Sequence, residues 1–237
     1  MGIYLNPGNS GFAQICRGEY VDKTGLAELI NQRINGPENL FCISRPRRFG
    51  KSYAAKMLVA YYDCSCDSHT LFDDKKIAET TNYRKHLNKY CVIYLDITAF
   101  ISEALTQNRS LRDVPGMIQE ALLKDLAECG FQVREGDSLN DNLVRIAGQP
   151  DGGKFVFVID EWDAVIREAK DDPEAQKKFL TFLRGWFKNG QFTPKVVAAA
   201  YMTGILPIKK DGSQSAISEF DEYTMVKPLF FDKYVGF

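Results

Sequence analysis

Four short apolar runs alternate along the chain with longer segments in which apolar residues recur at helical spacing. The runs occupy residues 40–44, 91–98, 154–165 and 195–204, and the third of them breaks into acidic residues. Because both faces of each run are apolar, we expect strands that are buried on both sides. Strands that alternate with helices predict an α/β fold in which helices cover both faces of a parallel sheet.

The segments between these runs carry signals for the start and the end of helices. Thr24 is placed to cap a helix that extends to about residue 35. Residues 50–62 are apolar nearly all round, which predicts a buried helix. Further helices are predicted at 115–129, at 138–148 and from 172 onward, and the last of these places five large apolar residues on one face: Phe179, Phe182, Leu183, Trp186 and Phe187.

The composition is that of an ordinary globular protein. The chain has 237 residues, of which 45% are hydrophobic and 26% charged, and its formal net charge is −1. This balance gives no global attraction for nucleic acid or for a membrane surface. No apolar run reaches the roughly 18 residues of a membrane helix, and the N-terminus lacks the basic start and apolar core of an export signal. We therefore expect a cytoplasmic protein with no membrane partner.

The chain contains six cysteines, which raises the question of metal binding. Three of them lie in apolar segments, as expected of reduced thiols that act as small hydrophobic residues. Cys64, Cys66 and His69 form the tightest group and could hold a metal ion, but no second pair completes a four-ligand zinc site. The spacing favours a loop with free thiols.

Residues 43–52, ISRPRRFGKS, nearly match the phosphate-binding loop G-x-x-x-x-G-K-[ST]. The segment follows a predicted strand and opens a predicted helix, which is the context that the motif requires. Its backbone amides would hold phosphate, Lys51 would reach the phosphates as a cation, and Ser52 would offer its hydroxyl to Mg²⁺. Gly50 is needed because a side chain there would collide with phosphate. The pattern predicts a nucleotide site.

The loop departs from the general motif at its first position. Arg45 stands where the pattern has glycine, and we expect the following proline to supply the turn by fixing its own backbone angle. Arg45, Arg47 and Arg48 place three cations at the start of the loop. They fit either a solvated basic loop or a set of contacts to phosphate, nucleic acid or another partner. In the second interpretation the nucleotide-binding residues are Pro46, Arg47, Arg48, Phe49, Gly50, Lys51 and Ser52.

The segment FVFVIDEWD, residues 155–163, is an apolar strand that ends in two acids. We expect this strand to lie beside the strand of the phosphate loop and to deliver Asp160 to the Mg²⁺ shell. Glu161 would then polarise a water molecule for attack on the γ-phosphate. A strand end with solvated acids is the alternative. The Gly-Lys-Ser loop about one hundred residues earlier favours the nucleotide site.

Two further strands bear on this site. Thr203 ends the fourth apolar run, where its hydroxyl could sense the γ-phosphate, orient the attacking water or simply end a strand. The run at 91–98 lies in the sequence between the loop and the acidic strand. We interpret it as the extra strand of the P-loop class that uses a glutamate to activate water, which favours an ATPase over a small GTPase. Asp96 in this run is either a cap of the following turn or a catalytic group.

Three motifs carry a resemblance to a known family: EYVDKTGL at 19–26, SRPRRFGKS at 44–52 and FVIDEWD at 157–163. The sequence resembles the AAA-ATPase-like family of predicted bacterial and archaeal ATPases. YMTGILPIKK at 201–210 and SEFDEYTM at 218–225 look like later blocks of that family. The likeness spans nearly the whole chain, and it is specific because an Arg-Pro-Arg-Arg-Phe loop replaces the first glycine in that family too.

The resemblance implies a P-loop NTPase fold with an additional strand, as an AAA-ATPase-like domain over residues 1–237. Residues 1–38 would form an N-terminal segment, 39–210 the P-loop core and 211–237 the start of a C-terminal connection. Family members usually continue into a helical lid and a PD-(D/E)XK nuclease-like domain. We expect both to be absent from this chain, which ends without a stop signal and looks like part of a longer protein.

The resemblance also implies roles for individual residues. Gly50, Lys51 and Ser52 correspond to the nucleotide loop, Asp160 to the aspartate that binds Mg²⁺, and Glu161 to the catalytic glutamate. These roles agree with the ones that the residue types and their spacing suggest.

Other positions remain open between two interpretations. Because the lid is expected to be missing, the arginine that it would set against the γ-phosphate is missing too. Arg184 is then either an internal substitute for that arginine or a residue of a helix surface. Asp22 and Lys23, in the EYVDKTGL block, are interpreted as a structural link into the following helix rather than as nucleotide contacts.

Two functions fit the sequence. The first is Mg²⁺-dependent ATP hydrolysis, in which Lys51 binds phosphate, Glu161 activates water and Thr203 assists. The second is a nucleotide-gated interaction module with little turnover, in which bound ATP sets how the chain meets a nuclease-like domain, nucleic acid or another protein. The sequence leaves the nucleobase preference, the biological process and the oligomeric state open.

Overall fold

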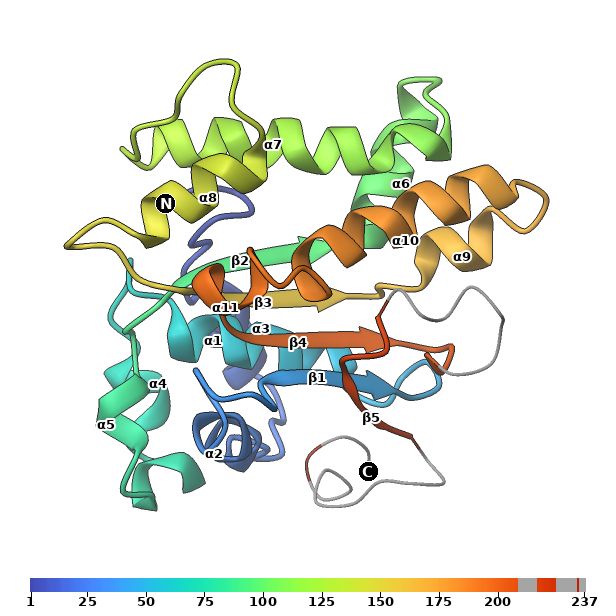
Figure 1. Cartoon of the computed structure of the whole chain (residues 1–237). Coiled ribbons are helices and arrows are strands. Elements are labelled where there is room, and N and C mark those ends of the chain that lie inside the picture. The colour runs from blue at the N-terminus through green and yellow to red at the C-terminus, as the bar shows by residue number, and fades with distance from the viewer. Residues whose placement is uncertain (209–216, 225–233, 235–237) are drawn as a thin grey trace.

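A five-stranded parallel sheet forms the centre of the computed structural model, which describes residues 1–208, 217–224 and 234 (Figure 1). The strands follow one another across the sheet in the order β2-β3-β4-β1-β5. The α/β fold with a parallel sheet that the apolar runs predict is therefore confirmed. The strand bounds are Leu40–Ser44 for β1, Cys91–Asp96 for β2, Phe155–Asp160 for β3, Val197–Gly204 for β4 and Asp221–Tyr223 for β5.

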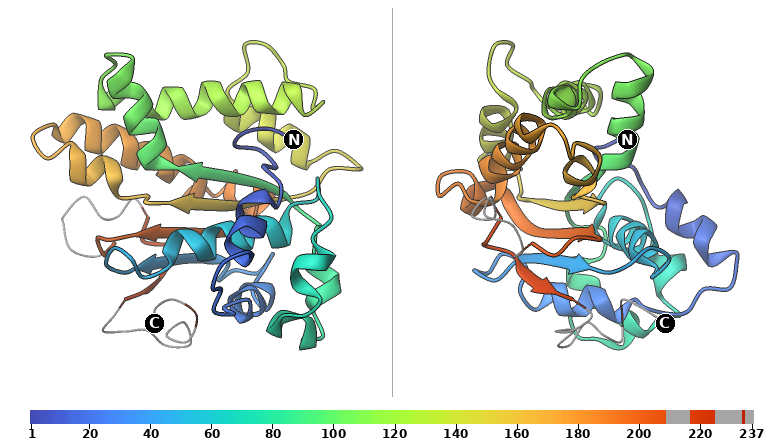
Figure 2. Two further views of the ribbon diagram at one scale, coloured as in Figure 1. Left: turned by 180° about the vertical axis from the view of Figure 1, so that it is seen from behind. Right: turned by 90° about the vertical axis from the view of Figure 1, so that its right-hand side faces the viewer.

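Helices cover both faces of the sheet, as the two views of Figure 2 show. On the face of α3 lie α1, α2, α4 and α5, and on the other face lie α6 to α11. The bounds are Ser10–Cys16 (α1), Gly25–Asn31 (α2), Lys51–Tyr62 (α3), His69–Phe72 (α4), Tyr83–His86 (α5), Ile97–Thr106 (α6), Val114–Glu128 (α7), Leu139–Ala147 (α8), Ala164–Glu168 (α9), Pro173–Phe187 (α10) and Thr193–Val196 (α11), with 3₁₀ turns at Lys76–Glu79 (η1) and Leu111–Asp113 (η2).

Alternate side chains of the central strands fill two separate apolar cores. Phe155, Phe157 and Ile159 of β3 pack against α6 to α11, whereas Val156 and Val158 of the same strand pack on the α3 side. This follows from the two-residue period of a strand, which sends neighbouring side chains to opposite faces. Because both faces of β3 are covered by apolar cores, polar functional groups can lie only at the ends of the strands.

The order of the strands corrects one expectation from the sequence. The acidic strand β3 does not lie beside the P-loop strand β1, because β4 separates them and pairs with both. The register sets Ile159 opposite Met202 and Ser44 opposite Gly204, so the carboxyl ends of all three strands reach the same edge. The strand that separates the loop from the acids in space is therefore β4, and the run at 91–98 forms an edge strand instead.

Two predicted strands end earlier than the apolar runs do. The run at 91–98 stops at Asp96, whose carboxylate accepts hydrogen bonds from the backbone N–H groups of Thr98 (3.0 Å) and Ala99 (3.4 Å) and so caps α6. The run at 154–165 stops at Asp160, because Glu161 has a positive φ of 53° that breaks the extended backbone. Residues 164–168 then form a short helix.

The start of α2 also differs from its prediction. Thr24 is at the N-cap position, but its side chain makes no capping hydrogen bond. Its hydroxyl instead donates to Asp22 at 2.7 Å and accepts from the backbone N–H of Ile77 at 3.2 Å. Thr24 therefore joins the EYVDKTGL block to the turn η1, and α2 ends earlier than expected, at Asn31.

A fifth strand, β5, lies in the tail that the sequence pattern leaves unassigned. It pairs in parallel with β1, and the carboxylate of Glu222 accepts hydrogen bonds from the Ser44 hydroxyl (3.1 Å) and from the backbone N–H of Ile208 (2.6 Å). Most of the predicted C-terminal connection at 211–237 lies outside the described residues. Within the described part of the chain, no helix combines the length and the apolar character needed to cross a bilayer.

Candidate functional site

The site lies at the carboxyl edge of the sheet, where β1, β3 and β4 end side by side (Figure 1). The segment 45–50 leaves β1 and leads directly into α3, as the motif requires. The backbone N–H of Arg45 donates to the carbonyl of Gly204 at 3.0 Å, which fixes the start of the loop to the end of β4. The side chain of Arg45 is buried, with 6% of the residue exposed. Of the three arginines that the sequence places at the start of the loop, Arg47 and Arg48 are exposed, whereas Arg45 is not.

Two residues of the loop adopt left-handed backbone conformations. Gly50 has a φ of 75° at the N-cap of α3, a conformation that glycine adopts without steric cost. Arg48 has a φ of 68°, which is unfavourable for a residue with a Cβ atom. Glycine at position 50 is therefore required by the turn itself, in addition to the space that a phosphate would need.

Lys51 points back into the loop rather than out to solvent. Its ammonium donates to the carbonyl oxygens of Arg45 and Pro46, both at 3.0 Å, and lies 3.5 Å from Oε1 of Glu161. Only 4% of its side chain is exposed. The loop thus curls around the ammonium group, and the same group reaches the acidic end of β3.

Asp160, the last residue of β3, lies in a pocket of hydroxyl groups. Its Oδ1 accepts a hydrogen bond from the hydroxyl of Thr203, and its carboxylate is also hydrogen-bonded to Ser52. Only 3% of Asp160 is exposed. Burial raises the pKa of Asp160 above its ordinary value, although the hydroxyls of Ser52 and Thr203 and the charge of Lys51 act in the opposite direction.

Glu161 follows directly in the sequence but lies in a different environment. Its backbone N–H donates to the hydroxyl of Thr203 at 3.2 Å, while its carboxylate contacts Nη2 of Arg167 at 2.5 Å and Nζ of Lys51 at 3.5 Å. The structure thus brings together Lys51, Ser52, Asp160, Glu161 and Thr203. The sequence predicts these five residues for the catalytic and metal groups.

Arg167 is a residue that the sequence reasoning missed. It lies on α9, and its guanidinium bridges Glu161 and Asp163, with Nε 3.1 Å from Oδ2 of Asp163. The signal in the sequence is weak, since an Asp and an Arg four residues apart are common on helix surfaces. Arg184, the candidate that the sequence offered as an internal arginine, is an exposed residue of α10.

Asp163 anchors the end of β4 to the acidic strand. It is fully buried, and its Oδ2 accepts hydrogen bonds from the backbone N–H groups of Ile205 (3.1 Å) and Leu206 (2.8 Å). Gly204 passes so close that a Cβ atom there would lie 2.6 Å from Nε1 of Trp162. The glycine after Thr203 is therefore needed for the close approach that holds Thr203 against both acids.

A cavity of about 710 Å³ opens from the phosphate loop toward the N-terminal segment. One wall is the loop and the start of α3, with Glu161 at its inner end, and the other wall is the EYVDKTGL block. Lys23 lines this cavity, whereas Asp22 is turned away and accepts hydrogen bonds from the backbone N–H groups of Thr24 and Lys76, both at 2.8 Å. Tyr53 lines the cavity from the first turn of α3, and the side chains that line it away from the loop are Glu19, Tyr20, Val21, Lys23 and Tyr234.

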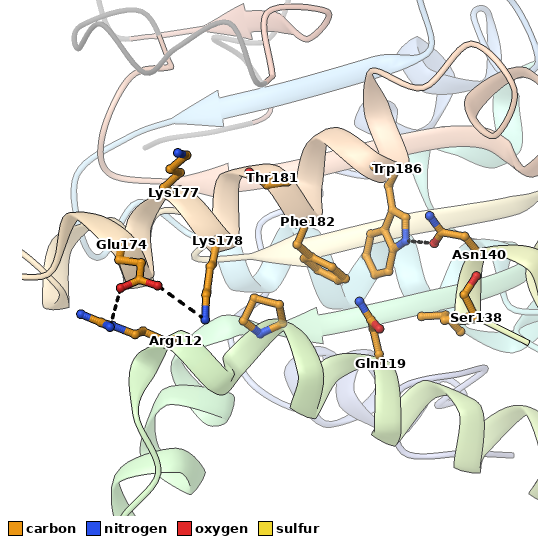
Figure 3. A pocket seen from close by; sticks show the side chains of 13 residues that line it. Arg112, Gln119, Ser138, Asn140, Glu174, Lys177, Lys178, Thr181, Phe182 and Trp186 are labelled. Atoms are coloured by element: carbon orange, nitrogen blue, oxygen red, sulfur yellow. Dashed lines mark hydrogen bonds and ion pairs between the residues drawn. The ribbon is translucent and has the colours of Figure 1, made fainter. Parts of the chain in front are cut away.

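A second cavity, of about 610 Å³, lies between α7 and α10 and contains none of the predicted site residues (Figure 3). Glu174 stands between Arg112 and Lys178, at 2.5 and 3.8 Å, and Arg112 also pairs with Asp172 at 2.8 Å, so each cation has a carboxylate partner. The indole N–H of Trp186 donates to Asn140 at 2.8 Å. In the described residues, no group of three or more His, Cys, Asp and Glu side chains is arranged to hold a metal ion.

The parallel sheet, its flanking helices and the loop between β1 and α3 define a P-loop NTPase-like protein. The chain belongs to the AAA-ATPase-like family, because the family model described as "Predicted AAA-ATPase" matches residues 8–213. Membership of a predicted ATPase family implies nucleotide binding.

The chain is also similar to a protein of Azotobacter chroococcum mcd 1 named "Uncharacterized protein in vnfD 5'region". The two sequences are 25% identical over 220 residues, which cover 90% of this chain and 39% of that relative. The chain thus spans well under half of the length of this relative.

Proposed function

We propose that the chain binds ATP at the loop between β1 and α3 and hydrolyses it with the help of Mg²⁺. The observation that carries this proposal is the convergence of the Lys51 ammonium, the Asp160 carboxylate and the Glu161 carboxylate at one edge of the sheet. In this proposal the backbone amides at the start of α3 and Lys51 bind the phosphates. When ATP binds, the ammonium of Lys51 would give up its hydrogen bonds to the carbonyls of Arg45 and Pro46 and donate to phosphate oxygens instead.

The residues at the end of β3 suit a magnesium ion. Mg²⁺ prefers oxygen ligands, and the Asp160 carboxylate and the Ser52 hydroxyl are hydrogen-bonded to each other at the place where the loop enters α3. When bound, the ion would neutralise charge on the phosphates. It would also favour the ionised form of Asp160, which burial alone disfavours.

Glu161 is proposed as the base that activates the attacking water. A base must lie close to the phosphate that is attacked, and Oε1 of Glu161 is 3.5 Å from the ammonium that binds phosphate in this proposal. Arg167 is a positioning residue in this scheme, because it holds the carboxylate of Glu161. Thr203 is proposed to hold the two neighbouring acids in place through its hydroxyl.

The nucleoside is proposed to occupy the outer part of the 710 Å³ cavity. This volume is within the range of small-molecule sites, and the aromatic rings of Tyr20, Tyr53 and Tyr234, together with Val21, offer surfaces for a base. Lys23 lies in the same wall and would extend the positive lining beyond the loop. In this proposal Tyr20, Val21 and Lys23 of the N-terminal segment form one side of the nucleoside site, together with Tyr53 of α3 and Tyr234, and the loop holds the phosphates.

A second function, a nucleotide-gated module with little turnover, is favoured by one observation. The carboxylate of Glu161 is engaged by two cations, Arg167 at 2.5 Å and Lys51 at 3.5 Å. A base that is bound in this way is less available to a water molecule, because both carboxylate oxygens already contact a cation. In this alternative, ATP binding would change how the chain meets a partner without rapid hydrolysis.

Calorimetry with ATP and Mg²⁺ tests the proposal, together with a measurement of phosphate release. We expect Lys51→Ala to lower ATP affinity by about tenfold to a hundredfold, the usual cost of losing a charge-assisted hydrogen bond. Lys56→Ala is the matched control, since Lys56 is an exposed lysine of the same helix. ATP binding without phosphate release would favour the gated module, and unchanged affinity in Lys51→Ala would overturn both functions.

A further inference from the structure

Two cysteines meet at the edge of the sheet opposite the phosphate loop. Cys64 follows the end of α3, and Cys91 is the first residue of β2 (Figure 1). The backbone N–H of Cys64 donates to the carbonyl of Tyr90, and the backbone N–H of Tyr90 donates to the carbonyl of Tyr62, both at 2.9 Å. These hydrogen bonds hold the two segments side by side, independently of the side chains.

The sulfur atoms of the two cysteines lie 3.7 Å apart. A disulfide requires about 2.0 Å, so the sulfurs must approach by roughly 1.7 Å to form the bond. Cys64 is exposed and Cys91 is partly exposed, which gives a small oxidant access to the pair. The sequence predicts free thiols in this loop, but it does not reveal that Cys91 lies against Cys64.

The environment makes Cys91 the more reactive thiol of the pair. The contact between the two thiols lowers the pKa of Cys91 to about 7, and the side-chain amide of Asn6, 3.6 Å from the sulfur, acts in the same direction. Burial and the charge of Asp63 oppose this shift. The same pairing raises the pKa of Cys64. The pairing therefore shifts Cys91 toward the thiolate, which is the form that reacts with oxidants.

We propose that Cys64 and Cys91 form a redox-active pair that hydrogen peroxide converts into a disulfide. The Cys91 thiolate attacks one peroxide oxygen, the O–O bond breaks, and sulfenic acid forms at Cys91 while the other oxygen leaves as hydroxide and takes up a proton. The Cys64 sulfur then attacks the Cys91 sulfur, the S–O bond breaks, and the oxygen leaves as water. The two thiols lose two electrons, and one peroxide becomes two water molecules.

Cys66 is the natural competitor, because it is only two residues from Cys64. Its sulfur is directed elsewhere, to the carbonyl of Asp63 and the hydroxyl of Ser68, both at 3.6 Å. The side-chain amide of Asn88 also contacts it at 3.8 Å. The geometry therefore selects Cys91, which is 27 positions away in the sequence, as the partner of Cys64.

The disulfide would link the segment that follows the C-terminus of α3 to the edge strand β2. Because the backbones are already paired, we expect the bond to stabilise the fold rather than distort it. A cross-link that closes a loop of this length raises the unfolding temperature by roughly 5–10 °C when it introduces little strain. Since the pair lies at the edge away from the loop, nucleotide affinity should stay unchanged.

Peptide mapping after mild oxidation tests the proposal. The reduced chain is treated with a small excess of hydrogen peroxide, remaining thiols are alkylated under denaturing conditions, and the digest is analysed by mass spectrometry without reduction. We expect the number of free thiols to fall from six to four, and a cross-linked peptide to join Cys64 to Cys91. The unfolding temperature should rise and return to its starting value after treatment with dithiothreitol.

The variants Cys64→Ser and Cys91→Ser should lose both the cross-link and the thermal shift, whereas Cys66→Ser should keep them. Cys64→Ser alters an exposed residue, so it keeps the test valid if Cys91→Ser folds poorly. A cross-link between Cys64 and Cys66 would overturn the proposal. Six free thiols after oxidation, or only sulfinic and sulfonic products, would overturn it as well.

Discussion

Asp160 and Glu161 are neighbours in the sequence, yet they lie in opposite kinds of environment. Asp160 is 3% exposed, and its hydrogen-bond partners in the site are the neutral hydroxyls of Thr203 and Ser52. The Glu161 side chain is 19% exposed and lies between the cations Lys51 and Arg167. The first environment disfavours a negative charge, whereas the second compensates one.

The difference arises from the backbone. Asp160 is the last residue of β3, and its side chain reaches the hydroxyls at the ends of β4 and of the loop. Glu161 turns out of the strand with a φ of 53°, and this turn carries its side chain toward α9 and Lys51. Thr203 touches both residues, since its hydroxyl donates to Asp160 and accepts from the backbone N–H of Glu161. A strand end with a single left-handed residue can thus hold two neighbouring acids in two different environments.

The largest expected effect is the loss of phosphate release when the Glu161 carboxylate is replaced. We expect Glu161→Gln to lower the rate of phosphate release by about 10²–10⁴-fold, the usual contribution of a general base, because an amide cannot accept the proton of the water. ATP affinity should stay close to the wild-type value. Glu168→Gln is the matched control, since Glu168 is an exposed glutamate of the same helix as Arg167. Wild-type turnover in Glu161→Gln would remove Glu161 from the catalytic role.

A smaller effect is expected when the cation that holds Glu161 is removed. Arg167→Met deletes the contacts to Glu161 and Asp163, and we expect the free energy of unfolding to fall by roughly 1–2 kcal/mol, between the values of exposed and buried ion pairs. Urea unfolding at low and high salt measures this loss. Arg17→Met, at an exposed arginine that follows α1, should cost much less. Equal losses in the two variants would show that Arg167 does not hold the acids.

The smallest expected effect is the contribution of Asp160 to the pH dependence of the free energy of unfolding. Because burial raises the pKa of Asp160 above 3.8 in the folded state, the folded protein retains this proton more strongly than the unfolded chain does. The wild type should therefore lose stability relative to Asp160→Asn as the pH rises from about 4, until Asp160 is ionised in the folded state. Urea unfolding of both proteins between about pH 3.5 and 7 measures the difference. If the wild type became more stable relative to Asp160→Asn as the pH rises over this range, the pKa of Asp160 would not be raised in the folded state.

Much of the fold could be predicted from the sequence because its signals are local. The four apolar runs became β1 to β4, and Ser138 and Asp172 cap α8 and α10 through their side chains. The strand order could not be predicted, because the pattern of a buried strand is the same whichever neighbours it has. Strand β5 was missed, since three residues carry too little pattern to be read.

At the candidate site, the sequence predicts which residues lie close together, but it does not predict all of their contacts. The types and spacing of Lys51, Asp160 and Glu161 identified them, and the structure places them together. The contact of Arg167 with Glu161 depends on where α9 turns after the strand, which no local pattern specifies. Tyr20 and Tyr234 line one cavity although more than two hundred residues separate them, and such a meeting follows only from the complete fold.

The magnesium dependence of ATP binding tests most directly whether the two neighbouring acids have different tasks. Calorimetric titrations of ATP are compared with and without Mg²⁺ for the wild type, Asp160→Asn and Glu161→Gln. We expect Mg²⁺ to raise the affinity of the wild type and of Glu161→Gln, and to leave that of Asp160→Asn unchanged. If Asp160→Asn kept the full magnesium effect, or if Glu161→Gln lost it, the division of tasks between the two carboxylates would be wrong.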